Sequence, residues 1–457
     1  MTKSKRMVQG ILDAIEQGRL MPGTRLASIR EAARQHGVSK NTVVDAYDQL
    51  VALGRVRARQ GAGFFVVKPL VLDTSEKTEE LNEAVDSVSL LREQLVGNFA
   101  VRVGDGRAPA SWMAGAILAR LAKQLTAADS DLEYGAPQGY MPLRETIARV
   151  LAGRSIHATQ DQVLLTFGAN HAFDLIIRHF VGPGDSVLVE TPGYYPLFGK
   201  LRLARAKLVG VPRSHEGLDL DDLERKIKQY RPGLFFLQPN AHNPTGTTLP
   251  PYQLHRLLTI AERYNVVLVE DDVFGDLSPR GSAHLAALDD LNRVIYVGSF
   301  SKTLSTGVRS GYLAGSPTLV SALTDIKMIT VVNSSTFNER LIHDMIEQGR
   351  YRRHLVQLRE RISKASASAA LALKDAGIQT HGAINEGYYL WGHLPPGIDA
   401  QALARRASDE GIFIAPGAIF SLRPNGPDAG ALRVHIAYAN DHRFLDFLKR
   451  YLFSSAT

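Results

Sequence analysis

One lysine follows an apolar run at a place where a buried strand is expected to end. The stretch "RVIYVGSFSKTL" puts Lys302 just after that run, and a charge that leaves a buried strand needs a partner or a chemical role. The run "VVLVEDD" ends in an acidic cluster whose middle member is Asp271. A lysine amine can form a Schiff base, and a buried carboxylate can keep a ring nitrogen protonated.

Other expected strand ends supply groups that would complete such a site. "TFGANHAF" reads as a strand, a glycine turn and a helix start, so the amides of Gly168 and Ala169 could hold a phosphate. "ETPGYYPL" offers the ring of Tyr194, and "QPNAHNPTG" places Asn243 in an Asn-Pro turn. Three more phosphate donors stand in "SFSKTLSTGVR": Ser299, Ser301 and Arg309. A lysine, an acid, a phosphate turn and an aromatic lid are together what pyridoxal phosphate (PLP) requires.

Each of these features also has a commoner use. Most glycine turns bind no phosphate, and most tyrosines pack against their neighbours. The acidic cluster could instead bind a metal ion, but no histidine stands at ligand spacing from it, so we expect no metal site.

The elements that would position these residues follow an α/β pattern. Apolar runs recur with helical segments between most of them: "QVLLTFG", "SVLVETPG", "GLFFLQPN", "VVLVEDD", "RVIYVGSF" and "SGYLAG". This alternation predicts a largely parallel sheet with helices on both faces. Ligands of such sheets bind beyond the carboxyl ends of the strands, so we expect the polar strand ends to meet at one site.

Composition narrows the protein class. The chain has 457 residues, 45% hydrophobic and 22% charged, which is ordinary for a globular protein of two or three domains. The absence of cysteine excludes disulfides and cysteine nucleophiles. The N-terminus lacks the apolar core of a signal peptide and no later stretch could span a membrane, so we expect a cytoplasmic protein without a membrane partner. The net charge of +7 is concentrated in residues 1–67, which hold eleven Lys and Arg against five Asp and Glu.

Local signals in this basic segment predict two short helices joined by a glycine turn. Ser28 and Ser39 stand where the helices would begin, and Gly37 would end the first one. The second helix carries inward-facing apolar residues at helical spacing: Val43, Val44, Tyr47, Leu50 and Leu53. "RVRARQGAGFFVV" then predicts a basic hairpin beside that helix. A helix-turn-helix with such a wing docks the start of its second helix in the major groove of DNA.

The stretch "PGTRLASIREAARQHGVSKNTVVDAYDQLVALGRVRARQGAGFFV" resembles the GntR-type winged-helix DNA-binding domain of bacterial transcription regulators. The resemblance implies DNA contacts from Arg30, Lys40 and Thr42 and a wing tip at 61–63. The helix start and the wing add the remaining expected DNA-binding residues: Ser39, Asn41, Arg59 and Gly61. A three-helix protein-interaction module is the alternative, which the basic wing disfavours.

The rest of the chain resembles fold type I aminotransferases of the aspartate aminotransferase superfamily. The motifs that carry this resemblance are "YGAPQGYMPLRETIA", "HNPTG", "VEDD", "SFSKTL" and "LRVHIAYAN". The resemblance implies an α/β domain with a mostly parallel seven-stranded sheet and a smaller α+β domain. It implies that Lys302 holds PLP as an internal aldimine, with Asp271 at the pyridine nitrogen and Asn243 near the ring hydroxyl. Further implied cofactor contacts are Tyr194, Ser299 and Arg309 from the same subunit and Tyr134 from a neighbouring one.

One arginine and one substitution bear on what the domain does. The resemblance implies that Arg433 clamps the carboxylate of an amino acid, although a salt bridge with Asp441 is an alternative. The family usually has a tyrosine three residues after the aspartate, where Phe274 stands. Phe167 and Ala169 likewise lack the hydroxyl groups common in the phosphate turn. These departures leave PLP capture possible and put efficient transamination in doubt.

The order of the parts resembles MocR-type regulators, a branch of the GntR group. We expect a winged helix in residues 1–68, a linker with helical content in 69–96, with a helix at about 75–95, and a PLP-binding effector domain in 97–457. The resemblance implies a head-to-tail homodimer, a double-stranded DNA operator with paired half-sites, and sensing of PLP itself or of a small amine or amino acid. An active aminotransferase with an N-terminal DNA-binding or autoregulatory unit is the alternative function.

Overall fold

The computed structural model describes residues 2–59, 61–67, 89–125, 133–279, 281–381 and 387–454. The chain separates into two compact units, 1–77 and 78–457, which are described in turn. Most of the expected linker and of the helix at 75–95 lies outside the described residues.

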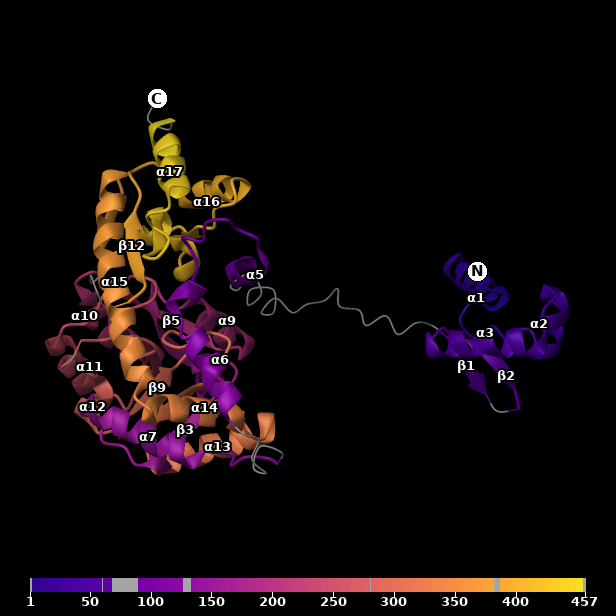
Figure 1. The fold of residues 1–457 in the computed structure, drawn as a ribbon, viewed down its shortest axis with the longest axis horizontal. Helices are drawn as coiled ribbons and strands as arrows, with labels where there is room; N and C mark the ends of the chain where they lie inside the picture. Colours follow the sequence, from indigo (N-terminus) through magenta and orange to yellow (C-terminus); the bar gives the residue numbers. More distant parts are fainter. Residues whose placement is uncertain are drawn as a thin grey trace. The chain divides into compact units, whose positions relative to one another are not determined.

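The first unit is a small helical domain with a hairpin (Figure 1). Its elements are α1 (Lys3–Glu16), α2 (Ile29–His36), α3 (Lys40–Ala52), β1 (Val56–Arg59) and β2 (Gly63–Val66). Ser28 caps α2 by accepting from the Glu31 amide over 3.3 Å, and Ser39 caps α3 by accepting from the Thr42 amide over 3.2 Å. Gly37 ends α2 with a left-handed φ of 59°.

The core of the first unit lies between α1, α3 and the hairpin. Val43, Tyr47 and Leu50 of α3 are buried in it, as predicted. Val44 is only half-buried, and Leu53, predicted to face inward, is 58% exposed because it lies at the C-cap, where the helix and its inner face end. β1 and β2 pair antiparallel, with Val56 opposite Val66 and Arg59 opposite Gly63.

The second unit is built on a mixed, mostly parallel sheet. Its strands run in the order β3-β10-β9-β8-β7-β4-β5-β6, with β10 and β6 antiparallel to their neighbours. Their bounds are β3 Val163–Thr166, β4 Ser186–Thr191, β5 Lys207–Ser214, β6 Gly217–Leu218, β7 Leu234–Leu237, β8 Val267–Asp271, β9 Val294–Ser299 and β10 Gly311–Ala314. The sheet therefore has eight strands instead of the seven expected, because the two-residue β6 folds back on the edge strand β5.

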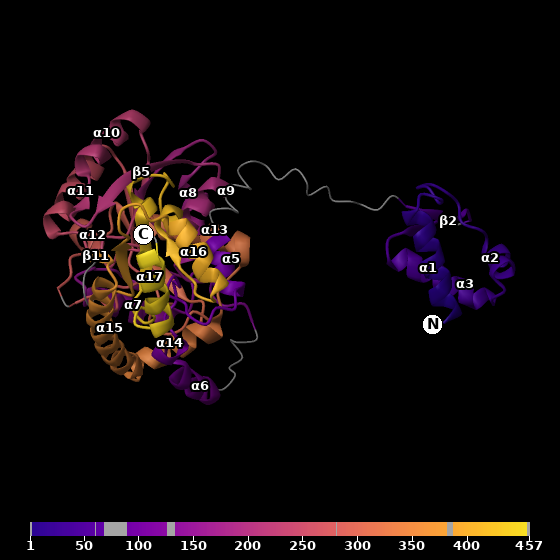
Figure 2. The same cartoon turned by 90° about the horizontal axis from the view of Figure 1, so that it is seen from above.

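Helices cover both faces of this sheet, which explains the continuously apolar strands. Phe235 and Leu268 belong to one hydrophobic cluster, and their chain neighbours Phe236 and Val269 belong to another. α8, α9 and α13 pack on the second cluster, and α7, α10, α11, α12 and α14 on the first (Figure 2). The bounds of the helices on the two faces are α6 Gly115–Gln124, α7 Met141–Ala152, α8 Ala169–Phe180, α9 Tyr195–Leu203, α10 Leu220–Tyr230, α11 Pro251–Arg263, α12 Leu285–Asp289, α13 Pro317–Val331 and α14 Thr336–Glu347.

A smaller antiparallel sheet follows the large one in the chain. Its strands lie in the order β11-β12-β14-β13, with bounds β11 Gln379–His381, β12 Tyr389–His393, β13 Ala415–Pro416 and β14 Ala431–His435. The long helix α15 (Arg350–Asp375) runs beside β12, and α16 (Ala400–Asp409) and α17 (His442–Ser454) lie at the same end of the unit (Figure 1). This arrangement matches the smaller α+β part that was expected.

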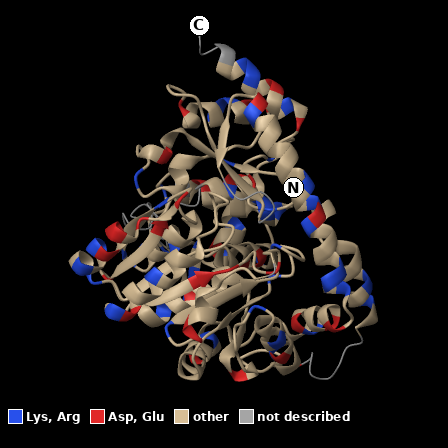
Figure 3. Cartoon of the chain, turned by 90° about the vertical axis from the view of Figure 1, so that its left-hand side faces the viewer, with Lys and Arg blue, Asp and Glu red and all other residues tan. Residues whose placement is uncertain are grey.

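One helix of the expected linker packs on the second unit. α5 (Ser89–Val96) buries Leu90 in the second hydrophobic cluster, so the second unit includes residues ahead of the expected domain start at 97. Lys and Arg alternate with Asp and Glu over the side of this unit shown in Figure 3, in keeping with its nearly balanced charge.

Within the part of the chain that the structure describes, no helix combines the length and apolarity needed to cross a membrane.

Candidate functional site

A cavity of about 450 Å³ lies where the carboxyl ends of the large strands meet the small sheet. Asp271 ends β8, Ser299 ends β9, and Gly168 follows β3 by two residues. Nine of the ten predicted own-subunit cofactor and effector residues line it: Ala169, Tyr194, Asn243, Asp271, Ser299, Ser301, Lys302, Arg309 and Arg433. The tenth, Gly168, stands beside it as the N-cap of α8.

Lys302 lies in the turn after β9, with its amine inside the cavity. Its Nζ donates to the Gly106 carbonyl and to the Tyr389 hydroxyl, which is 3.2 Å away. A primary amine in this position, at the end of a strand and facing a cavity, is placed to react with a carbonyl group.

Asp271 faces the same cavity without a hydrogen-bond partner for its buried Oδ1. Burial, together with the negative charge of neighbouring Asp272, raises the pKa of Asp271 to about 8. A carboxylate in this state is stabilised by a cationic N–H, so its position suits a protonated ring nitrogen.

The opposite end of the cavity offers donors for an anion. α8 begins at Gly168, which has a φ of 85° and provides no side-chain cap, so the first amides of the helix stay open. A Cβ at Gly168 would lie 3.5 Å from Arg309 Nη2 and 3.6 Å from Ser301 Oγ, so these groups surround one small space. Ser301 Oγ is buried and has no partner, and Arg309 donates to the Phe167 carbonyl over 3.0 Å.

Arg433 is almost fully buried, at 2% exposure, on β14. It donates to Asn243 Oδ1 over 2.9 Å and to the Gly104 carbonyl over 2.8 Å, while its Nε has no partner. The alternative salt bridge with Asp441 is absent, since Asp441 instead accepts from Arg443 over 2.7 Å. Arg433 therefore faces the cavity with a donor to spare, as carboxylate binding requires.

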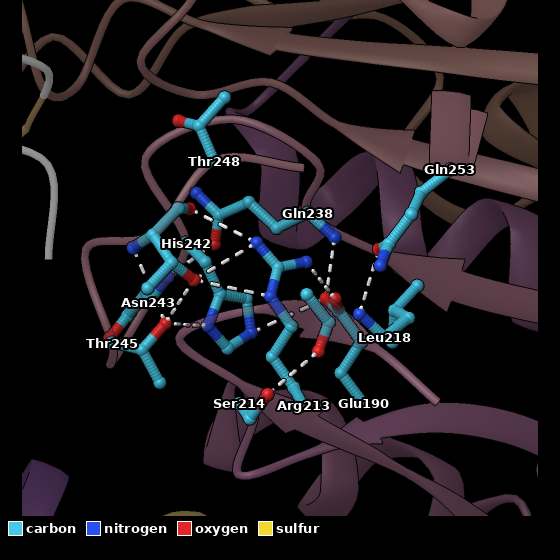
Figure 4. Close-up of polar contacts among 12 residues, drawn as sticks. Glu190, Arg213, Ser214, Leu218, Gln238, His242, Asn243, Thr245, Thr248 and Gln253 are labelled. Atoms are coloured by element: carbon cyan, nitrogen blue, oxygen red, sulfur yellow. Dashed lines mark hydrogen bonds and ion pairs between the residues drawn. The ribbon is translucent and has the colours of Figure 1, made fainter. Parts of the chain in front are cut away.

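A buried ion-pair network holds the Asn243 turn in place (Figure 4). Arg213 lies 2.7 Å from Glu190, and Glu190 also accepts from the Gln238 amide over 2.6 Å. Gln238 Oε1 in turn accepts from the Asn243 amide over 2.9 Å. Burial alone would raise the pKa of Glu190, but His242 and Arg213 outweigh it and hold that pKa below its usual range. The network thus stays charged behind the cavity and fixes the turn that carries Asn243.

The predicted DNA-binding residues lie on the surface of the first unit. Arg30, Lys40, Asn41 and Gly61 are exposed. Ser39 and Thr42 bond each other at 2.8 Å, so their hydroxyl groups are partly occupied by capping.

Arg59 lies on the wing with its guanidinium 5.0 Å from the Phe65 ring. Arg57, two residues before it on β1, is also exposed and shares its face of the strand. The alternation "RVRAR" could have revealed Arg57 from the sequence.

Comparison with known proteins assigns both units to families. Residues 96–448 match the family model "Aminotransferase class I and II", and residues 3–66 match "Bacterial regulatory proteins, gntR family". The chain is 31% identical over 440 residues to the uncharacterized HTH-type transcriptional regulator YdcR of Escherichia coli, covering 93% of each protein. The chain belongs to the MocR-type GntR regulators.

The second unit of this MocR-type regulator also has enzyme relatives. It is 33% identical over 315 residues to the 2-aminoadipate transaminase of Thermus thermophilus, covering 67% of this chain and 77% of the enzyme. The solved structure of LysN from Thermus thermophilus, complexed with N-(5'-phosphopyridoxyl)-L-leucine, superposes with a TM-score of 0.73 at 28% identity. That match covers 82% of this chain and 98% of LysN.

PLP is the cofactor of this fold, and the residues of the MocR-type chain fit it. Three buried polar atoms have no hydrogen-bond partner in the protein: Asp271 Oδ1, Ser301 Oγ and Arg433 Nε. Buried polar groups are normally paired, and a ligand such as PLP with an amino acid would supply the partners. When bound, PLP supplies a carbonyl for a lysine amine and a ring that withdraws electrons.

Several residues bear on the sequence analysis of this site. Phe274 does not face the cavity: it is buried, with its ring edge-on to Tyr388 at 5.3 Å, and Val273 lines the cavity instead. Tyr134, expected to act on a neighbouring subunit, does not differ from that expectation: it lies outside the cavity of its own chain and is 83% exposed. Tyr389 and Gln94 line the cavity without having been predicted, because they depend on the small sheet and on α5, which the motifs do not place.

Proposed function

We propose that this regulator binds PLP through Lys302 and uses the loaded cavity to sense an amino compound that bears a carboxylate, or PLP itself. The observation that carries the proposal is one cavity that brings together the Lys302 amine, the unpartnered Oδ1 of Asp271 and a buried Arg433 with a donor to spare. Lys302 would hold the cofactor, Asp271 would keep its ring nitrogen protonated, and Arg433 would bind the carboxylate of the effector.

The proposed assembly is a head-to-tail homodimer on DNA with paired half-sites. Tyr134, exposed in its own chain, would reach the phosphate bound by the partner subunit. The effector would act by favouring one arrangement of the two winged helices over another, and thereby change the affinity for the operator. Arg30, Lys40 and the wing would contact the DNA, and the protein would act in the cytoplasm.

The alternative function is transamination. The described site retains an arginine placed for a substrate carboxylate, and the enzyme relative with 33% identity is a transaminase. The cavity has Val273 in the segment after Asp271 where the family supplies a phenol, which favours binding over efficient turnover.

The visible absorption spectrum separates these functions. Purified protein with PLP is compared with Lys302→Ala while amino acids are added without a keto acid. A sensor forms a band that requires Lys302, shifts with one amino acid and then stays, and the same amino acid changes operator affinity. Loss of the band with release of the matching keto acid would instead establish transamination.

A further inference from the structure

Tyr389 presents a phenol to the reacting nitrogen of Lys302 from a different part of the fold. It begins β12 of the small sheet, whereas Lys302 follows β9 of the large one. The phenol oxygen lies 3.2 Å from Lys302 Nζ, and the side chain is only 2% exposed although it lines the cavity.

The direction of the hydrogen bonds around this phenol is fixed. Tyr389 donates to the Gly106 carbonyl over 2.8 Å. Because a carbonyl oxygen can only accept, the phenol proton is committed to Gly106, and the phenol oxygen is left to accept from Lys302. The Arg433 guanidinium lies 4.8 Å from the same ring and Phe274 packs against its edge at 5.8 Å, so the ring has little freedom to turn away.

The segment directly after Asp271, which includes Val273 and Phe274, brings no phenol to this nitrogen. Phe274 is buried and Val273 occupies that wall. Tyr194, on another wall, has its hydroxyl 3.2 Å from Asn170 Nδ2. Tyr389 is thus positioned to affect Lys302 through a contact that comes from the small sheet.

We propose that Tyr389 stabilises the proton on the Lys302 nitrogen, both in the free amine and when that nitrogen is joined to PLP. The second half of this proposal rests on the proposed cofactor binding. A charged N–H gains an acceptor from the phenol oxygen, which a hydrocarbon ring in the same place would not supply.

The matched control is the neighbouring Tyr388. It is equally buried, its ring packs on Phe274, and its hydroxyl donates to the backbone carbonyl of Lys302 and not to the amine. Tyr388→Phe therefore removes the same atom at the same depth without touching the reacting nitrogen.

The first measurement is the pH midpoint of the visible band in the full-length protein loaded with PLP. Tyr389→Phe should lower the midpoint by about 0.5–1 pH unit, the effect of one lost hydrogen bond, and Tyr388→Phe should leave it in place. An unchanged midpoint in Tyr389→Phe, or equal shifts in both variants, would overturn the proposal.

The second measurement needs no cofactor. Reductive methylation with formaldehyde at pH 7, followed by peptide mass spectrometry, should modify Lys302 roughly 2- to 10-fold faster in Tyr389→Phe than in wild type, with Tyr388→Phe at the wild-type rate. Equal rates in all three proteins would overturn the proposal for the free amine. If wild type forms no visible band that requires Lys302, the proposed cofactor binding fails, and the methylation rates still decide the role of Tyr389.

Discussion

The charge of Asp271 depends on what fills the cavity. Its pKa of about 8 arises from burial and from the adjacent carboxylate of Asp272, with no cationic partner at its Oδ1. The folded, cofactor-free protein therefore takes up a proton at Asp271 that the unfolded chain releases near pH 4. Because the pKa of Asp271 is raised in the folded state, ionisation of this carboxyl lowers the free energy of unfolding. The loss grows as the pH rises from about 4 to about 8.

Replacement of this carboxylate should reverse that loss. We expect cofactor-free Asp271→Asn to gain stability relative to wild type between about pH 5 and pH 8, by about 1 kcal/mol or more, because asparagine does not titrate. Thermal unfolding at the two pH values measures the gain. PLP should stabilise wild type more than the variant, and a stability difference that is independent of pH would contradict the assignment.

The position of a cavity residue could be predicted where it belongs to a recognisable sequence motif, and not where it lies outside one. Lys302, Asp271 and Asn243 end apolar strands or stand in recognisable turns, so the sequence could place them at one edge of the sheet. Which of Val273 and Phe274 faces the cavity depends on the turn after β8, where the regular alternation of a strand no longer holds. Tyr389 was missed because its place depends on how the small sheet packs against the large one.

Among the elements, α5 forms part of the cavity wall and is hydrogen-bonded to the loop that follows it. Gln94 on α5 donates to Asp105 over 2.6 Å, and its carbonyl accepts from Arg107 over 2.8 Å. Asp105 is buried and also binds Arg102 at 2.7 Å. Burial would raise the pKa of Asp105, but Arg107 and Arg102 outweigh it and hold that pKa below its usual range.

Asp105→Asn should loosen α5. We expect the variant to lose about 1–3 kcal/mol of stability at pH 7, because two guanidinium groups lose their charged acceptor. A lowered carboxyl pKa stabilises the fold above the unfolded value near 4 and loses that effect as the pH falls further, so the difference should shrink in acid. Urea unfolding at pH 7 and about pH 3.5 tests this, and an undiminished difference in acid would exclude the ion pair as its cause.

We expect the DNA contacts of the first unit to come from the start of α3 and from the wing. Lys40→Ala should weaken operator binding and lower the dependence of affinity on salt by about one phosphate contact. Titration of labelled operator at several salt concentrations measures both, with Lys3→Ala at the start of α1 as control. An unchanged salt slope would place Lys40 away from the phosphates.

For the whole molecule, the proposed dimer predicts that each site is completed by the other subunit. Tyr134→Phe should weaken PLP retention roughly tenfold, because a hydroxyl bonded to a phosphate would be lost. Dialysis of loaded protein followed by absorbance measures retention. Tyr252→Phe is the control, since Tyr252 is likewise exposed. Full retention in Tyr134→Phe would show that the partner supplies no such contact.

The same assembly predicts two protected half-sites per dimer in a footprint of the operator, in direct or inverted order. A footprint that covers one half-site per dimer would contradict the paired arrangement.

The place of α5 also determines how the protein can be dissected. Leu91, Gln94 and Leu95 form part of the cavity wall, yet they precede residue 97, the effector-domain start expected from the sequence, and residue 96, where the match to the aminotransferase family model begins. A fragment that starts at 97 would lack one wall of the cavity. It would also expose the apolar surface that Leu90 covers. Ligand affinities measured on such a fragment would reflect the missing cavity wall and not the intact site. A fragment that begins at 78 would keep this wall.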